Sequence, residues 1–478
     1  MSYRLNVVVV AMLSLCLTAP AALAVPDVIV GGVGVSGASG ANQNDFVEWG
    51  GSGGIMAFSI ATTSCNIGTS PLNWYDYNGG GSPGINHHPI IGQNMFRLMD
   101  GKFEHIGQSW LKHGFSALDQ TFCGPCVNPN SFDVLGVGCS DPYTGSRNGT
   151  GGSGCGSFLG PKSDVNATTG VFPCPFSRTA SGVPNLIRGR LQVQTSDLAI
   201  PGAQYYFEGQ YVTQDDTAAG NGYNNASWRE VSVGAAPNYL IIPQGPTVRE
   251  EPAIFAWQDA DPFVKLLPMN DADGGRFWLG YRVTDLGGGM WHYEYAVQNL
   301  TSHASGQSFS IPIPAGVNIS NIGFHDCDYH SNEIHGGTDW NVTVGGSNIT
   351  WETETWTAGN DLTANALRWG TLYNFRFDAN APPAPGALAT LGLFRPIAPS
   401  SLTSVVLAPV APEICDCPGD LDGSTTVDGG DIQNFVDMYV GNSPVGICAE
   451  LDGPTGEALD SDDLDAFVSL LVNASACP

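Results

Sequence analysis

Basic side chains are scarce in this sequence. Its 478 residues include 17 Lys and Arg against 45 Asp and Glu, which leaves a net charge of −28. Such a surface repels phosphate backbones and therefore argues against nucleic acid as a partner. Charged residues of both signs make up only 13% of the chain, and stretches rich in Ala, Glu, Lys and Leu are nearly absent. A mainly helical fold is therefore disfavoured.

No stretch beyond the N-terminus is apolar for long enough to span a membrane. The N-terminus itself (1–24) has the parts of a secretory signal: a basic residue, an apolar run over 7–17, and small residues at Ala22 and Ala24. The alternative, an uncleaved membrane anchor, is disfavoured because this run is too short to cross a bilayer. We therefore expect a mature chain that begins at Val25, carries no transmembrane segment, and is secreted or displayed at the cell surface.

Glycine and aromatic residues are plentiful: the chain has 62 glycines, and Phe, Trp and Tyr make up 10% of it. Together with Asn and Thr, they indicate β-strands joined by tight turns. Two runs in which every second residue is large and apolar flank a Gly-Gly-Gly turn at 287–289, which predicts a β-hairpin. The sequence therefore predicts a mainly β protein in which the region 25–397 is an antiparallel β-sandwich. The alternating positions are Tyr205, Phe207, Tyr211, Phe277, Leu279, Tyr281, Val283, Trp291, Tyr293, Tyr295, Val297, Phe309, Ile311, Ile313, Tyr373, Phe375 and Phe377.

Composition also divides the chain. The large region is either one block or two β domains, 25–245 and 246–397, and a Cys- and Gly-rich insertion over 123–174 interrupts its first half. A proline-containing stretch, 398–414, is predicted to be an interdomain linker. A compact segment rich in Asp and Cys follows it, and we expect 415–478 to fold as a separate module.

Twelve cysteines are present, and one of them, Cys16, leaves with the signal. Disulfides persist in exported proteins, so we expect most of the other eleven to be paired, with an odd one left over. The sequence leaves their pairing open. Cys123 and Cys126 form a C-G-P-C motif typical of thioredoxin-type redox sites, but such a site needs a helix after it, and Pro129 breaks one. A structural disulfide is the favoured interpretation.

The C-terminal segment contains an internal duplication. Segments that begin at Asp431 and Asp463 match one another, and Asp428 and Asp460 keep the same offset of 32 residues. Each copy starts an amphipathic helix, whose apolar residues fall on one face. Neither short helix can bury such a face alone, so the two are predicted to pack together. The faces consist of Ile432, Phe435, Val436 and Tyr439 in the first copy and Leu464, Phe467, Val468 and Leu471 in the second.

An acidic loop of twelve residues precedes the first helix. Counted from its first aspartate, oxygen-bearing side chains stand at positions 1, 3, 5, 9 and 12, and the residue at position 7 offers its backbone carbonyl. This spacing wraps a loop around one hard cation, and calcium prefers about six to eight oxygen ligands. The loop departs from the usual pattern at position 6, where Thr425 replaces glycine. We predict a calcium ion whose binding is coupled to folding. Its ligands would be Asp420, Asp422, Ser424, Thr426, Asp428 and Asp431.

Two loop–helix repeats after a linker resemble the dockerin family, whose duplicated F-hand is an EF-hand-like loop followed by a single helix. The flanking cysteines are similar to those of the form found at the C-termini of exported planctomycete-type proteins. The resemblance covers 415–478 and implies calcium-dependent folding and docking onto a cohesin-like or surface-anchoring partner protein. It also implies a second calcium site, in which two extra residues lengthen the loop. The ligands of that site would be Glu450, Asp452, Asp460 and Asp463.

The densest polar cluster of the large region spans 324–335. Its histidines and acids are ligand types that zinc or iron prefers. On a strand, however, the alternation of side chains would divide them between two faces, and no metalloenzyme spacing such as H-E-x-x-H is present. The favoured alternative is a polar loop after a strand over 319–324. The candidate ligands are His325, Asp326, Asp328, His330 and His335.

Glu208 with Asp215 and Asp216 is a candidate acid pair of a glycosidase or a calcium loop, and the alternative is a strand followed by a polar loop. No nucleophile, phosphate-binding or dinucleotide motif stands in a supporting context, so catalytic residues stay unidentified. Two functions are left open. The sequence favours a non-enzymatic extracellular or cell-surface β-protein attached through its dockerin-like module. The alternative, which the resemblance implies, is a secreted protein that degrades or binds polysaccharide.

Overall fold

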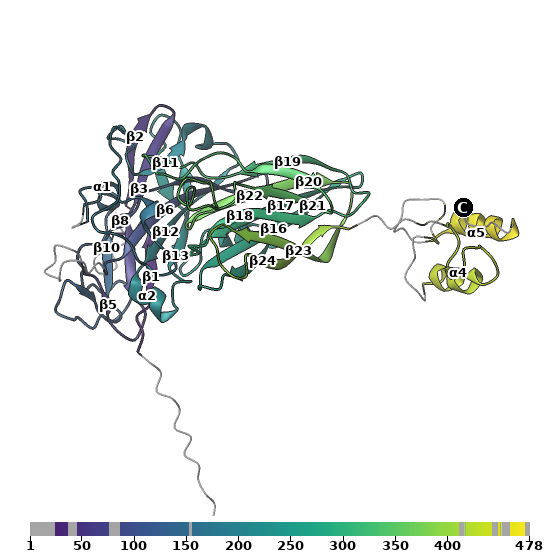
Figure 1. Cartoon of the computed structure of the whole chain (residues 1–478), viewed down its shortest axis with the longest axis horizontal. Coiled ribbons are helices and arrows are strands. Elements are labelled where there is room, and N and C mark those ends of the chain that lie inside the picture. Colours follow the sequence, from purple (N-terminus) through teal and green to yellow (C-terminus); the bar gives the residue numbers. More distant parts are fainter. Residues whose placement is uncertain are drawn as a thin grey trace, which may run out of the picture.

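Antiparallel sheets make up most of the computed structural model, which has 40% of its residues in strands and 11% in helices. The predicted mainly β, sandwich-type fold is confirmed. Figure 1 shows the sheets of the N-terminal half beside those of the C-terminal half. The structure describes residues 24–36, 45–75, 87–152, 155–410, 415, 417–441, 448–449, 451 and 459–473.

The N-terminal half is built on a large sheet, whose strands follow the order β14-β13-β12-β6-β7-β11-β3-β2, with β8 beside β6. A smaller sheet, β1-β4-β10, lies against it, and side chains of both, such as Val30 and Phe207, share one hydrophobic core. The strands of the large sheet are β2 (Phe46–Ser52), β3 (Ile55–Ile60), β6 (Ile90–Met99), β7 (Lys102–Gln108), β8 (Lys112–His113), β11 (Leu191–Gln194), β12 (Gln204–Val212), β13 (Ala226–Val233) and β14 (Ile241–Pro243). Those of the small sheet are β1 (Val28–Val33), β4 (Thr62–Asn66) and β10 (Ser140–Tyr143).

Short elements lie between these strands. They are the pair β5 (Leu72–Asn73) and β9 (Val134–Leu135), the helices α1 (Gly145–Thr150), α2 (Gln214–Ala219) and α3 (Phe255–Ala260), and the 3-10 turns η2 (Lys162–Asp164) and η3 (Thr195–Asp197).

The C-terminal half is a sandwich of two five-stranded sheets, ordered β15-β16-β17-β22-β19 and β20-β21-β18-β23-β24. Its core is rich in the alternating aromatic residues of the sequence, and the rings of Phe309 and Phe375 stack across it with centroids 4.6 Å apart. The hairpin predicted around 287–289 is β16–β17, in which Tyr281 pairs with Tyr295. The strands are β15 (Lys265–Asn270), β16 (Arg276–Gly287), β17 (Met290–Asn299), β18 (Gly306–Pro312), β19 (Ile319–His325), β20 (Asn341–Gly345), β21 (Asn348–Glu352), β22 (Thr371–Ala379), β23 (Pro383–Leu393) and β24 (Ser401–Pro409).

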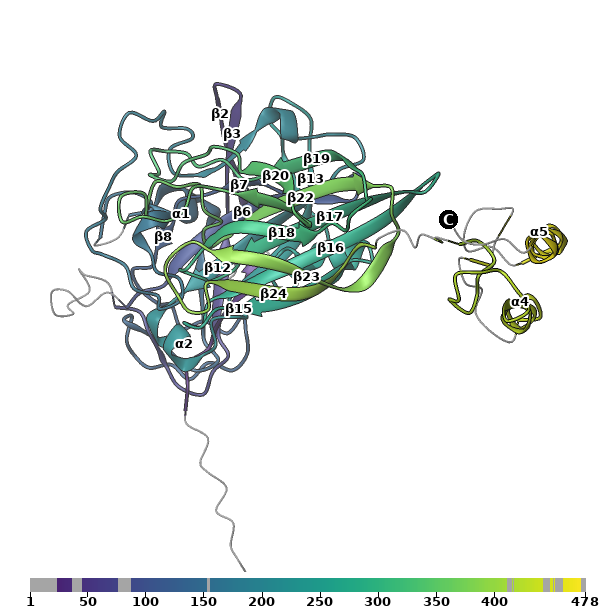
Figure 2. The ribbon, with the colours of Figure 1, turned by 45° about the vertical axis from the view of Figure 1, so that its right-hand side comes forward.

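A third core joins the two halves. It packs Phe96, Phe103 and Tyr206 of the N-terminal sheet against Trp257 of α3 and Leu372 of β22. Polar groups cross the same junction, where buried side chains of one half donate hydrogen bonds to the other. The two views in Figures 1 and 2 both place these sheets side by side. The halves therefore share a continuous interior.

The predicted linker 398–414 is wrong over most of its length. Residues Ser401–Pro409 form β24, which pairs with β23 at the edge of the sandwich. Leu402, Val406 and Ala408 alternate into the core. Pro409 is compatible with this strand because an edge strand tolerates a residue that cannot donate to the ladder.

A truncation tests this boundary. A chain that ends at residue 397 lacks β24 and is expected to lose about 3–5 kcal/mol of unfolding free energy, since three inward side chains are removed from the core. A chain that ends at Val410 keeps the strand and is expected to unfold at the temperature of the intact large region. Differential scanning calorimetry of the two truncations compares them directly. Equal midpoints would show that β24 contributes nothing to the sandwich.

The cysteines are mostly paired. Cys123 bonds to Cys65 and Cys126 bonds to Cys139, so the two cysteines of the C-G-P-C motif have different partners, and the predicted structural role is confirmed. Cys327 is free and buried. The other described bonds are Cys155–Cys174 and Cys415–Cys448, and Cys417 is disulfide-bonded as well.

These disulfides are compatible with an extracellular protein. The predicted signal lies outside the described residues, apart from its last position. None of the described helices has the length and apolar character needed to cross a membrane.

Candidate functional site

The C-terminal duplication produces two packed helices, α4 (Asp431–Tyr439) and α5 (Ser461–Val472). They lie side by side in Figures 1 and 2. Phe435 and Phe467 stack between them with ring centroids 4.1 Å apart and an interplanar angle of 4°. The two rings occupy the same position of the repeat, so the core is formed by equivalent residues. Val427 and Ala449 complete its buried centre.

Three carboxylates converge in the first acidic loop. Oxygen atoms of Asp420, Asp422 and Asp431 all lie within 4.8 Å of one another. Asp431 is fully buried at the start of α4, and it accepts hydrogen bonds from the backbone N–H groups of Leu421 (2.5 Å), Asp422 (3.0 Å) and Asp428 (2.9 Å). These bonds fold the loop back over the beginning of the helix. The carboxylates are therefore held together although their charges repel.

Asp420 is held by the turn that follows it. Its carboxylate accepts hydrogen bonds from the backbone of Gly423 (2.8 Å), Ser424 (3.1 Å) and Thr425 (2.8 Å). Desolvation raises the pKa of Asp420, but these donors outweigh that effect, so its pKa is lowered and the anionic form is favoured. Thr425 has a φ of +72°. Position 6 of the loop, which is normally glycine, therefore has the left-handed backbone conformation that glycine adopts, although the side chain of Thr425 disfavours this conformation.

The remaining predicted ligands of this loop contact one another. The Ser424 hydroxyl donates to the backbone carbonyl of Thr426 (3.0 Å), and the Thr426 hydroxyl donates to Asp428 (3.2 Å). Asp428 also accepts from the backbone of Gly430 (2.7 Å). The structure therefore brings three of the six predicted ligands into one cluster and places the other three along the same loop. All six residues offer oxygen atoms as metal ligands, and calcium prefers such hard ligands.

The second loop repeats the anchoring of the first. Asp463 is buried and accepts from the backbone of Leu451 (2.7 Å) and Asp460 (3.0 Å), as Asp431 does in the first copy. Asp460 caps α5 by accepting from the backbone of Asp462 (2.7 Å). The predicted ligands Glu450 and Asp452 lie outside the described residues.

The outer surface of the helix pair carries exposed apolar side chains. The two helices pack together as predicted, but the prediction that their whole apolar faces are buried is wrong. Phe435 and Phe467 fill the space between the helices, and apolar residues beside them, such as Val436 and Val468, stay exposed. Six residues form two matching rows, which we call the apolar stripe, and their exposed fractions run from 36% to 79%. They are Ile432 and Val436 on α4, Val440 directly after its last residue, and Leu464, Val468 and Val472 on α5.

No protein-family model matches the chain, and no curated protein matches it either.

The histidine-rich segment does not form a joint ligand set. The rings of His325, His330 and His335 lie against the backbone carbonyls of His105, Gln108 and Leu362, at 3.3, 2.7 and 2.6 Å. Burial lowers the pKa of His330 to about 4 and lowers that of His335 well below its usual value. The neutral rings of His330 and His335 therefore hold the segment against β7 and against the turn that contains Leu362.

The two acids of the segment are also engaged separately. Asp326 accepts from Asn365 (2.6 Å), and Asp328 accepts from Gln194 (3.4 Å). The segment after β19 is thus a polar loop whose side chains hold it in place.

The candidate acid pair of the first half is divided between two structural roles. Glu208 is fully buried at the junction of the halves. Asp216 is buried too, and it accepts from the backbone of Val28 (2.8 Å) and from Asn225 (2.7 Å). Asp215 accepts from the backbone of Asn73 (3.0 Å). None of the three lines a described cavity.

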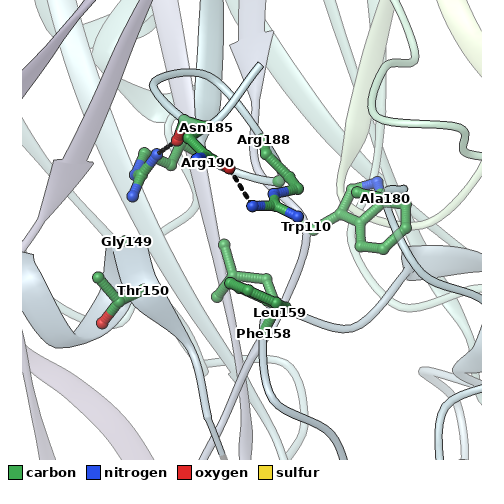
Figure 3. Close-up of a pocket in the computed structure, with 10 residues that line it drawn as sticks. Trp110, Gly149, Thr150, Phe158, Leu159, Ala180, Asn185, Arg188 and Arg190 are labelled. Carbon is green, nitrogen blue, oxygen red and sulfur yellow. Dashed lines mark hydrogen bonds between the residues drawn. The ribbon is translucent and has the colours of Figure 1, made fainter. Parts of the chain in front are cut away.

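A surface cavity of about 290 Å³ lies beside α1 and the segment after Ala180 (Figure 3). Arg188 lies over the ring of Phe158 at 4.4 Å, and Arg190 lies over that of Trp49 at 3.8 Å. None of the described residues that line the cavity is an Asp or Glu. Glycoside hydrolysis needs two carboxyl groups, so this cavity does not supply its chemistry. The described lining is Trp110, Gly149, Thr150, Phe158, Leu159, Ala180, Asn185, Arg188, Gly189 and Arg190.

Proposed function

We propose that the helix pair is a calcium-dependent docking module that attaches a secreted, β-rich protein to a cohesin-like or surface-anchoring partner. The observation that carries the proposal is the apolar stripe, which repeats on both helices and lies outside the core. Exposed apolar groups that are clustered in this way are typical of a surface that is covered by a partner.

Calcium would act on the orientation of the helices. Each helix carries in its first turn a buried aspartate that closes its own acidic loop, Asp431 in one copy and Asp463 in the other. A cation held by Asp420, Asp422 and Asp431 would offset the repulsion between them and fix the start of α4. When the first turns of both helices are fixed in this way, the two rows of the apolar stripe are held in one orientation relative to each other. Docking is therefore expected to need the ion even though the stripe itself is apolar.

The large region is proposed to be a non-enzymatic cargo. Its carboxylates at the junction are buried and hydrogen-bonded, and its described arginine-lined cavity lacks acids. Disulfides in both the large region and the module suit a location outside the cell. The polysaccharide-degrading alternative has no comparable support from described residues.

Docking is tested by placing charge on the stripe. The double variant Val436→Asp/Val468→Asp is expected to weaken calcium-dependent binding to purified cohesin-like modules by at least about 100-fold, because both rows lose an apolar contact near their centre. Surface plasmon resonance in calcium and in EDTA measures the effect. The matched control is Val405→Asp, an exposed valine on β24 outside the module. Unchanged binding by the double variant, or full binding in EDTA, would contradict the proposal.

A further inference from the structure

Lys162 is a buried lysine in the interior of the large region. It lies in η2, is 3% exposed, and its amino group contacts three neutral oxygens. The amino group donates to the Gln108 side chain (2.9 Å), the Gly370 carbonyl (3.1 Å) and the side-chain oxygen of Asn94 (3.4 Å). The Trp369 ring lies 5.7 Å from it. A lysine in such surroundings is readily uncharged and nucleophilic.

The pKa of the Lys162 amino group is lower than that of an ordinary lysine. Desolvation lowers the pKa of Lys162 to about 8, although the charges of Cys327, Glu208 and Glu333 oppose the effect. A substantial fraction of the amine is therefore neutral near physiological pH, in contrast to an exposed lysine.

A carboxamide and a carboxyl group lie next to this amine. Asn94 of β6 and Glu208 of β12 are directly paired across the sheet, and both are buried. The Asn94 side-chain nitrogen donates to Glu208 at 2.8 Å. The Asn94 oxygen points to the amine and its nitrogen to the carboxyl group, so the carboxamide lies between the two. The backbone of Ala253 (2.6 Å) and the side chain of Gln298 (2.9 Å) hold Glu208 in place.

We propose that Lys162 and Asn94 are joined by an intramolecular isopeptide bond, with Glu208 as the group that carries the proton. The uncharged Nζ attacks Cγ of Asn94, and one Nζ proton passes to the carboxylate of Glu208. The Cγ–Nδ2 bond breaks, and the proton on Glu208 leaves with Nδ2 as ammonia. The amine and the carboxamide thereby become a secondary amide, Glu208 returns to its starting state, and no oxidant or other reactant is consumed.

The surroundings favour this reaction in three ways. The fold holds the amine and the carboxamide in contact, which replaces a collision by an oriented approach. Glu208 already touches the nitrogen that has to leave. Burial of all three groups keeps competing water away, so the amide product is not hydrolysed.

The bond would fasten η2 to the centre of the large sheet. Lys162 and Asn94 are separated by 68 residues, so the cross-link closes a long loop. The carbonyl of Gly370, which contacts the same amine, belongs to the C-terminal half. The cross-link therefore lies at the junction of the two halves. This proposal does not depend on whether the C-terminal helix pair docks onto a partner.

The test is the mass of the full mature chain after its disulfides are reduced and alkylated. The expected mass is lower by one ammonia molecule than the mass calculated for the mature sequence with every cysteine alkylated. A protease digest is expected to contain a branched peptide that joins residues 94 and 162. Asn374 is the internal control, because it donates to the buried Glu294 at 3.0 Å in the same way but no lysine is hydrogen-bonded to it among the described residues. Its carboxamide is expected to stay intact. The full sequence mass, or an ammonia loss with separate linear peptides at residues 94 and 162, would overturn the proposal.

Variants assign the roles. Lys162→Met and Glu208→Gln are both expected to have the full sequence mass, the first because it lacks the amine and the second because it lacks the proton carrier. Lys112→Met is the matched control, since this other buried lysine contacts the backbone of His113 and Gly152 instead. It is expected to keep the branched peptide. A branched peptide in the Glu208→Gln protein would contradict the role of Glu208, and if a variant does not fold, the digest of the unchanged chain decides.

Discussion

Replacing Asp431 with asparagine is expected to lower the calcium affinity of the first loop by at least about 100-fold. The Asp431 carboxylate is buried, accepts three backbone hydrogen bonds and shares a cluster with Asp420 and Asp422. Asparagine keeps the size of the side chain but loses the charge and one acceptor oxygen. The backbone of Asp428, which bonds to the second oxygen, then has no acceptor there. Isothermal titration calorimetry of the full chain with calcium measures the change.

The matched control is Asp437→Asn on the same helix. Asp437 lies outside the loop and accepts from Gln433 at 3.1 Å. The Asp437→Asn substitution removes the same charge from the module but leaves the carboxylate cluster intact. The calcium affinity is therefore expected to stay within about twofold of that of the unchanged protein. If both variants bind equally well, the cluster is not a calcium site.

The second large effect concerns the stacked pair at the centre of the module. Phe435→Ala is expected to cost about 3–5 kcal/mol of unfolding free energy, because it leaves a cavity opposite the ring of Phe467. A module of this size has little other core to compensate, so it should unfold in the absence of calcium. Hydrogen exchange of the α4 and α5 amides in the full chain measures the loss.

Val436→Ala provides the comparison for this variant. Val436 is adjacent in sequence but 43% exposed, and its truncation is expected to change stability by less than about 1 kcal/mol. Calcium is expected to restore part of the protection that Phe435→Ala loses, since an ion that binds only the folded module shifts the equilibrium towards it. Equal exchange in the two variants would contradict the packing of the helices through their phenylalanines.

The sandwich could be predicted from sequence where alternation is strong. Tyr293 and Tyr295 follow a period of two beside a glycine turn, and this pattern is local enough to define a strand and its inward face. Strand β24 was missed because its inward residues, Leu402, Val406 and Ala408, are mixed with small residues and prolines. What makes it a strand is the free edge of β23, which lies elsewhere in the sequence.

Of the candidate sites, one could be predicted from the sequence and the other could not. Asp420, Asp422 and Asp431 lie within twelve residues, so their spacing in the sequence predicted that their carboxylates converge, whereas the equally predicted Asp428 lies outside that cluster. The group formed by Lys162, Asn94 and Glu208 was not predictable, because its members are 68 and 114 residues apart and meet only through the pairing of β6 with β12 and the position of η2. A lysine, an asparagine and a glutamate that are distant in sequence carry no signal of their own.

The sequence by itself determined the strand periodicity, the duplicated loop–helix units and the spacing of the acidic side chains in the first loop, since each depends on residues close together in the chain. Only the tertiary structure decided which helix residues are buried. Phe435 and Phe467 fill the space between the helices, and Val436 and Val468 are left outside. The physical reason is geometric: a helix has a broad apolar face, one neighbouring helix covers only part of it, and which part is covered depends on how the two helices are placed.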